Sequence, residues 1–185
     1  MIVISGASAS GKTEVAKILF KKYGIVRAIT TTTREVRCNE KDGVDYFFVS
    51  KDRFEQMLRE DRFVEHTIFN GNFYGSTKDQ VEENKCIVVD PAGLRAYIGL
   101  GDECVITFFL DSCDDTRLKR MLLRGDEEQK AINRLEHDKK AFRKNRIARV
   151  DYHIDSETLD LEQMADKIYS LYKQELMKRH EEDKY

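Results

Sequence analysis

A loop rich in glycine and serine near the start of the chain holds the residues with the most specific chemistry. Residues 6–13 match the pattern G-x-x-x-x-G-K-[ST]. Glycines let the backbone turn so that several N–H groups converge on an anion, and the helix that follows adds partial positive charge. The lysine of this pattern reaches the β- and γ-phosphates, and the hydroxyl beside it can hold Mg²⁺. The pattern predicts a nucleoside triphosphate site made of Gly6, Ala7, Ser8, Ala9, Ser10, Gly11, Lys12 and Thr13.

The residues on either side of this loop support that interpretation. The apolar residues 2–4 precede it, as in a short buried strand, and Val15, Ile18 and Leu19 follow it at helical spacing. A plain turn between a strand and a helix is the alternative, but it gives no reason for a lysine and a threonine directly after the second glycine. We therefore expect Lys12 to bind phosphate and the Thr13 hydroxyl to bind Mg²⁺.

A second group of anion-binding side chains lies further along the chain. Residues 30–37 are four threonines followed by Arg-Glu-Val-Arg, so hydroxyl groups stand beside Arg34 and Arg37. Arginine guanidinium groups match phosphate oxygens through two parallel hydrogen bonds. A doubly charged monophosphate needs about this much cationic and hydroxyl capacity. The alternative is a polar surface loop whose arginines are unrelated.

Apolar runs and helical patterns alternate along the rest of the chain. We expect strands at residues 2–5, 26–30, 85–90, 103–110 and 152–155, and helices at 12–23, 94–98, 114–123 and 159–179. Such alternation is typical of a parallel sheet with helices on both faces, whose ligands bind at the carboxyl ends of the strands. The predicted fold class is α/β, a P-loop three-layer α/β/α arrangement around a parallel core sheet.

Two stretches depart from this alternation. Residues 31–83 predict a small mixed insertion, with a strand at 45–49, a helix at 51–59 and a strand at 63–69 that turns back at 70–72. Residues 117–149 contain twelve Lys and Arg against five Asp and Glu. A solvated helix face explains most runs of charge, but beside a triphosphate site an arginine-bearing helical lid is a competing interpretation.

These expectations divide one domain, residues 1–185, into three parts. The core comprises residues 1–30, 84–116 and 150–185, the insertion residues 31–83 and the lid residues 117–149. A chain of this length can bury a substantial core.

Composition limits the classes of protein that remain. The chain is 41% hydrophobic and 36% charged, which is too apolar for disorder, and its net charge of -2 does not favour a nucleic acid partner. We find no run long enough to span a membrane and no signal peptide, and we expect a cytoplasmic protein. The four cysteines show no C-x-x-C spacing and the four histidines are scattered, so we expect thiols and no zinc site.

Several motifs in order along the chain resemble those of the guanylate kinase family, and the similarity covers nearly the whole length. The family segments T-T-R-x-x-R, G-x-D-Y-x-F-V-S, F-x-E and G-N-x-Y-G-[ST] correspond to residues 32–37, 43–50, 63–65 and 71–76. Together with the phosphate loop, these segments are far more specific than any one of them.

The resemblance implies a role for each matching position. It implies that Arg34, Arg37, Tyr46 and Tyr74 bind the phosphate of GMP, and that Glu65 and Ser76 contact the guanine. Thr30 and Asp90 complete the GMP-binding residues that we expect. The implied catalytic residues are Lys12, Arg34, Arg124 and Arg134, with Arg120 as a weaker third arginine of the lid. The family also contacts adenine near residues 155–156, although we select no adenine-binding residue.

The chemistry of guanine agrees with the implied role of Glu65. A carboxylate can accept hydrogen bonds from both the ring N1–H and the exocyclic amine of guanine, whereas adenine presents an acceptor at N1. A buried polar group left unpaired costs about 1–3 kcal/mol, which is enough to discriminate between the bases. Each of these residues also has an ordinary structural alternative. Glu65 would point to water from an edge strand, Tyr46 and Tyr74 would only pack, and Ser76 would cap a helix.

The chain also departs from the family pattern. The strand before Pro91 carries two acidic residues in the family, but here Val88 replaces the first and only Asp90 remains. The second arginine at position 37 follows Val36 instead of the usual proline. Because the missing carboxylate helps to bind guanine and to organise the metal region in the family, base specificity could be looser or turnover slower.

The resemblance implies an enzyme that transfers the γ-phosphoryl group of ATP to GMP or dGMP with Mg²⁺, giving ADP and GDP in purine nucleotide metabolism. Its partners would be these small substrates, with no nucleic acid and no membrane, in a monomer or homodimer. One alternative is a kinase of another small acceptor such as a ribosyl phosphate. Another is a non-catalytic protein-binding module, against which the intact Lys12 and Thr13 argue.

Overall fold

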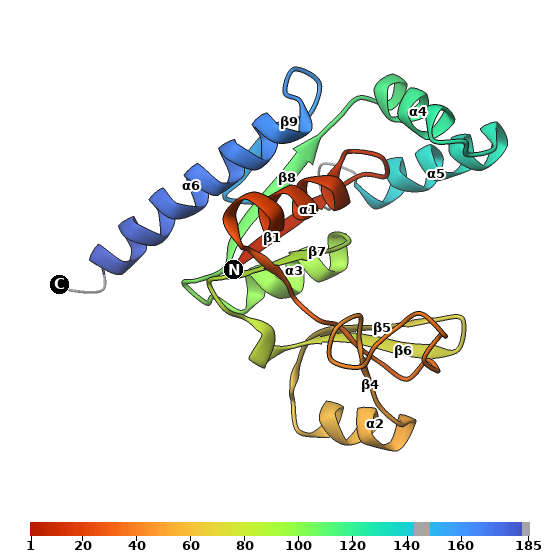
Figure 1. The fold of residues 1–185 in the computed structure, drawn as a ribbon, viewed down its shortest axis with the longest axis vertical. Coiled ribbons are helices and arrows are strands. Elements are labelled where there is room, and N and C mark those ends of the chain that lie inside the picture. Colours follow the sequence, from red (N-terminus) through yellow and green to blue (C-terminus); the bar gives the residue numbers. More distant parts are fainter. Residues whose placement is uncertain (143–148, 183–185) are drawn as a thin grey trace.

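The structure, a computed structural model, describes residues 1–142 and 149–182. Residues 143–148 of the expected lid and residues 183–185 of the expected core lie outside this part of the chain. Figure 1 shows a central sheet flanked by helices, a second sheet below it, and the helices α4 (Asp114–Leu123) and α5 (Glu128–Ala141) at the upper right.

The central sheet has five parallel strands in the order β2-β7-β1-β8-β9. They are β2 (Val26–Arg27), β7 (Lys85–Val88), β1 (Ile2–Gly6), β8 (Ile106–Asp111) and β9 (Tyr152–Asp155). In the register, Ile4 of β1 pairs with Val88 on one side and Phe108 on the other. The loop that follows β1 therefore lies at the centre of the carboxyl edge of the sheet. The predicted α/β fold with a parallel core sheet is confirmed.

Helices cover both faces of this sheet. They are α1 (Lys12–Tyr23) and α6 (Leu161–Glu182) on one face and α3 (Pro91–Gly99) on the other. Ile2 and Ile4 are buried against the side of α1 and α6, while Val3 packs with Leu94 and Tyr97 of α3. Because both faces of β1 are covered, its residues are apolar without alternation.

Side-chain caps decide where two of these helices begin. The Asp90 carboxylate accepts a hydrogen bond from the N–H of Gly93 at 2.8 Å, and Pro91 occupies the first turn. The helix therefore begins at Pro91, earlier than the expected 94, and β7 ends at Val88. At the start of α6, Asp160 and Gln163 exchange side-chain to backbone hydrogen bonds of 2.8 and 3.0 Å, as in a capping box. None of the helices in the described residues is both long and apolar enough to cross a bilayer.

The second sheet has four strands in the order β4-β3-β6-β5. They are β4 (Phe47–Phe48), β3 (Thr31–Thr32), β6 (Asn72–Thr77) and β5 (Phe63–Phe69), and a short 3-10 helix, η1 (Lys78–Gln80), follows. The helix α2 (Lys51–Arg59) packs Phe54 and Met57 against Phe63. This small core is separate from the two cores of the central sheet, so the second sheet has its own packing.

The expected strands at 26–30 and 45–49 are shorter in the structure. After Arg27 the chain leaves the central sheet, and the N–H of Ile29 donates to the side chain of Gln80 at 3.1 Å. Thr31 then joins the second sheet beside Phe47. Residues 28–30 therefore connect the two sheets instead of continuing the strand. Asp45 lies in a turn, because its carboxylate accepts from the N–H of Lys41 at 2.8 Å.

The helices α4 and α5 pack against each other through Met121, Ala131 and Leu135. Ala9, from the loop after β1, also contacts this cluster. The helix α4 has the expected bounds of 114–123 and so begins before the proposed lid at 117, whereas the sequence patterns gave no bounds for α5. Apolar contacts therefore join the described part of the expected lid to the loop.

Candidate active site

The backbone of the phosphate loop, defined here as residues 6–13, follows from its small residues. Gly6 has a φ of +149°, and a Cβ at this position would lie 2.8 Å from the carbonyl oxygen of Leu110. Only glycine fits where β1 ends so close to β8. Ala9 has a φ of +61° and Gly11 a φ of +98°. Left-handed residues within a turn of this kind form concave cradles of N–H groups that bind anions.

Lys12 lies in the first turn of α1. Its ammonium donates a hydrogen bond to the carbonyl oxygen of Ala7 at 2.8 Å. Burial lowers the pKa of Lys12 to about 8, an effect that Asp138 opposes and Arg117 increases. The ammonium is therefore largely charged at pH 7 and can bind phosphate.

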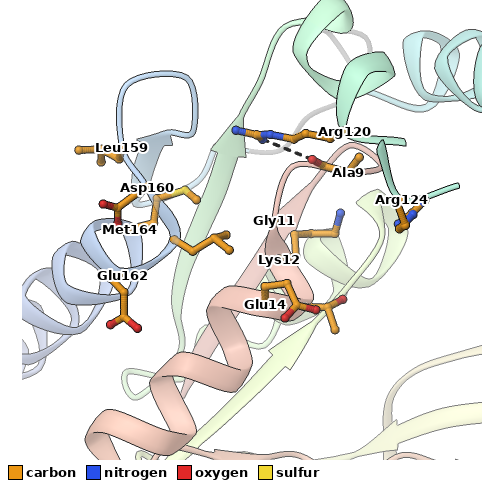
Figure 2. A pocket seen from close by; sticks show the side chains of 12 residues that line it. Ala9, Gly11, Lys12, Glu14, Arg120, Arg124, Leu159, Asp160, Glu162 and Met164 are labelled. Carbon is orange, nitrogen blue, oxygen red and sulfur yellow. Dashed lines mark hydrogen bonds between the residues drawn. The ribbon is translucent and has the colours of Figure 1, made fainter. Parts of the chain in front are cut away.

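A hollow of about 660 Å³ opens beside this lysine. Figure 2 shows the Lys12 amine rising from α1 between Arg120 and Arg124, with Leu159 and Met164 on the opposite side. The cations come from the phosphate loop and α4, whereas the apolar residues come from α6 and the segment before it. This arrangement provides room for phosphates beside Lys12 and an apolar wall for a base.

Arg120 is held against the phosphate loop and is not a solvated helix charge. Its guanidinium donates to the carbonyl oxygen of Ala9 at 3.3 Å and to the carbonyl oxygen of Ser156 at 2.6 Å (Figure 2 shows the first contact). Ser156 itself is fully buried. Arg120 thus joins α4 to the phosphate loop and to the segment near residues 155–156 where the resemblance places adenine.

The other two arginines of the expected lid share one carboxylate. Arg124 forms a two-pronged ion pair with Asp126, and Arg134 pairs with the same side chain at 3.0 Å. Both arginines are about half exposed, with relative side-chain exposures of 54%. Arg124 lines the hollow, but Arg134 does not. Sequence reasoning missed Asp126, which holds these two cations close together.

The second sheet gathers an arginine and two tyrosines. The Arg34 guanidinium lies 5.4 Å from the centre of the Tyr46 ring, and the rings of Tyr46 and Tyr74 are 6.1 Å apart. Glu40 pairs with Arg34 at 2.8 Å, and this contact raises the pKa of Arg34 and lowers that of Glu40. The three expected phosphate-binding side chains therefore lie together, with Glu40 as a counter-ion that the sequence did not reveal.

Three further expected residues have different surroundings. Arg37 is exposed, and its N–H donates at 3.0 Å to the Glu40 carboxylate that also pairs with Arg34, whereas its guanidinium has no hydrogen bond within the described residues. Thr30 lines a groove beside Thr13 and Val88. Asp90 caps α3, which uses one of its carboxylate oxygens. Val88 is 38% exposed, so an apolar side chain faces solvent where the family pattern has a carboxylate.

Glu65 and Ser76 form a hydrogen-bonded pair across β5 and β6. One carboxylate oxygen of Glu65 accepts from the Ser76 hydroxyl at 2.8 Å and from its N–H at 3.2 Å. A Cβ on Gly75 would lie 2.6 Å from the Phe63 ring, so glycine lets the two strands approach here. Glu65 is half-buried against Ser76, and Ser76 lies within β6 and caps no helix. The second oxygen of Glu65 is left to accept other hydrogen bonds.

Tyr97 of α3 lies beside this pair, and the sequence analysis did not identify it. Its side chain is fully buried, and its hydroxyl has no hydrogen-bond partner among the described residues. Burial raises the pKa of Tyr97 to about 12, an effect that the nearby Ser76 opposes. A buried hydroxyl without a partner is a cost to the folded state.

We expect Tyr97→Phe to raise the free energy of unfolding by about 1 kcal/mol, because it removes an unpaired buried hydroxyl and keeps the ring. Chemical denaturation measures this change. Tyr172→Phe is the matched control, since the buried Tyr172 hydroxyl donates to the carbonyl oxygen of Glu83 at 2.6 Å and its loss should destabilise the fold. Equal destabilisation by both variants would show that the Tyr97 hydroxyl is paired.

The residues around Thr13 fit a magnesium ion. Thr13 is exposed at the hollow beside Lys12, and its hydroxyl makes no hydrogen bond to another described residue. Mg²⁺ prefers oxygen ligands, keeps several waters and binds mostly through substrate phosphates in kinases. No cluster of three or more His, Cys, Asp or Glu forms a metal site elsewhere in the described residues. One hydroxyl beside a triphosphate is therefore an adequate protein contribution.

The parallel sheet, the phosphate loop after its central strand and the cations around Lys12 define a P-loop nucleotide-binding protein. The family model described as guanylate kinase matches residues 1–175. A guanylate kinase of Anaplasma phagocytophilum strain HZ is 32% identical over 188 residues, covering 96% of this chain and 88% of that protein. A guanylate kinase of Chlorobaculum tepidum is 34% identical over 145 residues, covering 74% of each chain.

A solved structure agrees with these sequence relatives. The crystal structure of guanylate kinase from Anaplasma phagocytophilum matches with a TM-score of 0.59 and 27% identity, covering 96% of this chain and 86% of that chain. This chain belongs to the guanylate kinase family. The resemblance inferred from its motifs is confirmed.

Proposed function

We propose that this chain transfers the γ-phosphoryl group of ATP to GMP or dGMP and releases ADP and GDP or dGDP. The bond between the γ-phosphorus and the bridging oxygen to the β-phosphorus breaks, and a bond forms to a phosphate oxygen of the acceptor. That oxygen is already anionic, so no strong general base is needed. Such reactions depend mainly on positioning and on neutralisation of charge.

The pairing of Glu65 with Ser76 carries this proposal, together with its place in the second sheet. Tyr74 lies in β6 of the sheet that holds this pair, and Arg34 and Tyr46 lie beside its strands β3 and β4. A cationic and hydroxyl-rich site for a phosphate thus accompanies a carboxylate with a free oxygen for the N–H groups of guanine. A kinase of a ribosyl phosphate would need the phosphate site but not the carboxylate that recognises guanine.

The proposed roles divide the chain as the sequence analysis did. The phosphate loop with Lys12 holds the triphosphate, and the insertion of residues 31–83 holds the acceptor through Arg34 and Arg37 and the base through Glu65. The lid of residues 117–149 supplies Arg124 and Arg134. As the lid closes, these two arginines leave the Asp126 carboxylate and bind the phosphoryl group that is transferred. Closure excludes water and limits hydrolysis of ATP.

Magnesium, location and assembly complete the proposal. The hydroxyl of Thr13 would hold Mg²⁺, which supplies charge neutralisation for the phosphates when bound. Thr30, which follows β2, and Asp90, which follows β7, would contact GMP. We propose a cytoplasmic protein that acts as a monomer or homodimer in purine nucleotide metabolism.

An acceptor panel tests the reaction directly. We expect rapid ADP formation from ATP and Mg²⁺ with GMP or dGMP, and little with IMP, AMP, a ribosyl phosphate or no acceptor. IMP lacks the exocyclic amine of guanine, so it isolates one of the two hydrogen bonds to Glu65. Loss of one such hydrogen bond should make IMP roughly tenfold or more poorer than GMP as an acceptor. Coupled measurement of ADP and thin-layer separation of the nucleotide products give both rate and identity.

Two results of this panel would contradict the proposal. A ribosyl phosphate as the best acceptor would assign the chain to the alternative kinase. The absence of turnover with every acceptor, in a protein that binds ATP, would favour a non-catalytic module.

A further inference from the structure

A buried carboxylate of α5 contacts the phosphate loop directly. Asp138 is 7% exposed, and its Oδ2 accepts hydrogen bonds from the N–H of Ser8 at 2.7 Å and from the guanidinium of Arg117 at 2.8 Å. Hydrogen bonds with an ionised partner are roughly twice as strong as neutral ones. One side chain therefore joins the phosphate loop, α4 and α5.

Arg117 is the second half of this connection. It is 3% exposed and also pairs with Asp114 in the first turn of α4, which Lys139 of α5 contacts at 3.1 Å. Removal of one partner from a buried ion pair leaves an uncompensated charge and is strongly destabilising. The two helices are thus fixed to each other by charge as well as by the apolar contacts of Met121.

The connection lies outside the nucleotide hollow. Within the described residues, neither Ser8 nor Arg117 nor Asp138 lines the space beside Lys12. Asp138 therefore takes up one N–H group of the phosphate loop, that of Ser8, without lining the space beside Lys12. It holds the loop from the side that faces α4 and α5.

The spacing of arginines along α4 gives this anchor a consequence for the site. Arg117, Arg120 and Arg124 are separated by three and four residues, which places them on one face of the helix. Arg120 and Arg124 line the hollow, and Arg117 is fixed to Asp138. A rotation of α4 that carried these arginines away from Lys12 would break the contact between Arg117 and Asp138.

We propose that Asp138 is a positioning residue for phosphoryl transfer, which acts through Ser8 on the phosphate loop and through Arg117 on the direction of Arg120 and Arg124. This inference rests on the proposed function, since it assigns these groups to the same reaction. It adds a residue that touches no substrate and that neither the phosphate-loop pattern nor the family motifs contain. Loss of Asp138 should raise the KM for ATP and lower kcat, and it should leave the KM for GMP nearly unchanged.

The double variant Arg117→Met with Asp138→Leu is the principal test. It removes both charges together. Met121 follows Arg117 by four residues and Leu135 precedes Asp138 by three, so each new apolar side chain has an apolar neighbour on its own helix and the fold should persist. We expect the KM for ATP to rise about tenfold and kcat to fall several-fold, while the KM for GMP stays within about twofold, because one charge-assisted anchor is lost. Glu136→Gln, an exposed carboxylate on the same helix, is the control and should match the wild type.

Two further measurements keep the test independent of folding and of catalysis. Asp138→Asn keeps an oxygen that can accept from the Ser8 N–H but loses the charge toward Arg117, so its kinetics should lie between those of the wild type and the double variant. Exchange of the Ser8 amide proton, followed by NMR without substrates, should accelerate about tenfold in the double variant and less in Asp138→Asn.

The outcomes separate this inference from the proposed function. Wild-type values of kcat and KM for ATP in the folded double variant would overturn the inference, and so would tighter binding of ATP, which would make Asp138 a competitor of phosphate. Equal increases in the KM for ATP and GMP would also overturn it, since a general loss of structure explains them. An inactive wild type with the expected change in Ser8 exchange would refute the function and leave the anchor in place.

Discussion

Lys12→Ala lowers kcat about 10³-fold, as expected for removal of one preorganised cation from a phosphoryl-transfer site. Lys12 is the only charged side chain of the phosphate loop, and it lines the hollow. Because its ammonium is buried, water cannot easily take its place beside a phosphate. Steady-state kinetics with ATP and GMP, together with thermal unfolding of the variant, measure the loss in a folded protein. The Kd for GMP should stay unchanged, because the second sheet makes no use of this side chain.

Lys17→Ala is the matched control for this prediction. Lys17 lies on the same helix five residues later, is exposed, and pairs with Glu14 at 2.8 Å. Its loss removes the same charge from α1 without entering the space between Arg120 and Arg124. Comparable losses of kcat in both variants would mean that the net charge of α1, and not the position of Lys12, determines the rate.

The phosphate loop is the part of the site that the sequence predicts best, because its residues are consecutive. The pattern of residues 6–13 contains both the turn and the groups that bind phosphate, and Gly6 is required by the closeness of β8. Nothing distant is needed to place Lys12 beside the N–H groups of its own loop. In a local motif of this kind, consecutive residues determine most of the geometry.

Contacts between distant residues could not be found in this way. Ser8 and Asp138 are 130 positions apart, and Asp138 lies within a run of charge where it resembles Glu136. The structure distinguishes the two, since one is buried against Arg117 and the other is exposed beside Lys139. Burial, which a run of charged residues does not reveal, determines which of them acts on the site.

Some misplaced boundaries did have a signal in the sequence. The order Asp90, Pro91 and Gly93 is a helix start, with a capping acid before the proline, yet the expected helix began at 94. The end of β2 at Arg27, before the expected 30, had no such signal, because contacts with Gln80 and Phe47 lead the chain from the central sheet to the second. Tertiary partners overrode an apolar run that by itself indicates one strand.

The proposed base selection depends on a side chain that only the family resemblance singled out. Glu65 follows an irregularity in the pairing of β5 with β6, where Phe63 pairs with Thr77 and Glu65 with Ser76. Alternation along the strand would not place its carboxylate beside Ser76. The serine fixes one oxygen of Glu65 through two hydrogen bonds, so the other oxygen is held in a defined direction before any base arrives.

Glu65→Gln should lower kcat/KM for GMP about 100-fold, because a hydrogen bond to a charged acceptor is lost and an amide N–H₂ meets the donors of guanine. The value for AMP should change little or rise slightly, since adenine offers an acceptor at N1 to the new donor. Glutamine keeps the size of the side chain, and its carbonyl oxygen can still accept from Ser76. Competition between GMP and AMP for one pool of ATP measures the ratio directly.

Glu55→Gln provides the comparison within the insertion of residues 31–83, because Glu55 is a partly exposed carboxylate of α2 that lies 3.9 Å from the Lys51 ammonium. It should leave the ratio of GMP to AMP unchanged. If Glu65→Gln lowered kcat/KM for GMP and for AMP by the same factor, Glu65 would support the structure of the insertion without recognising the base. A selective loss of GMP would instead show that one preoriented carboxylate oxygen suffices for guanine recognition even with Val88 in the place of a second acid.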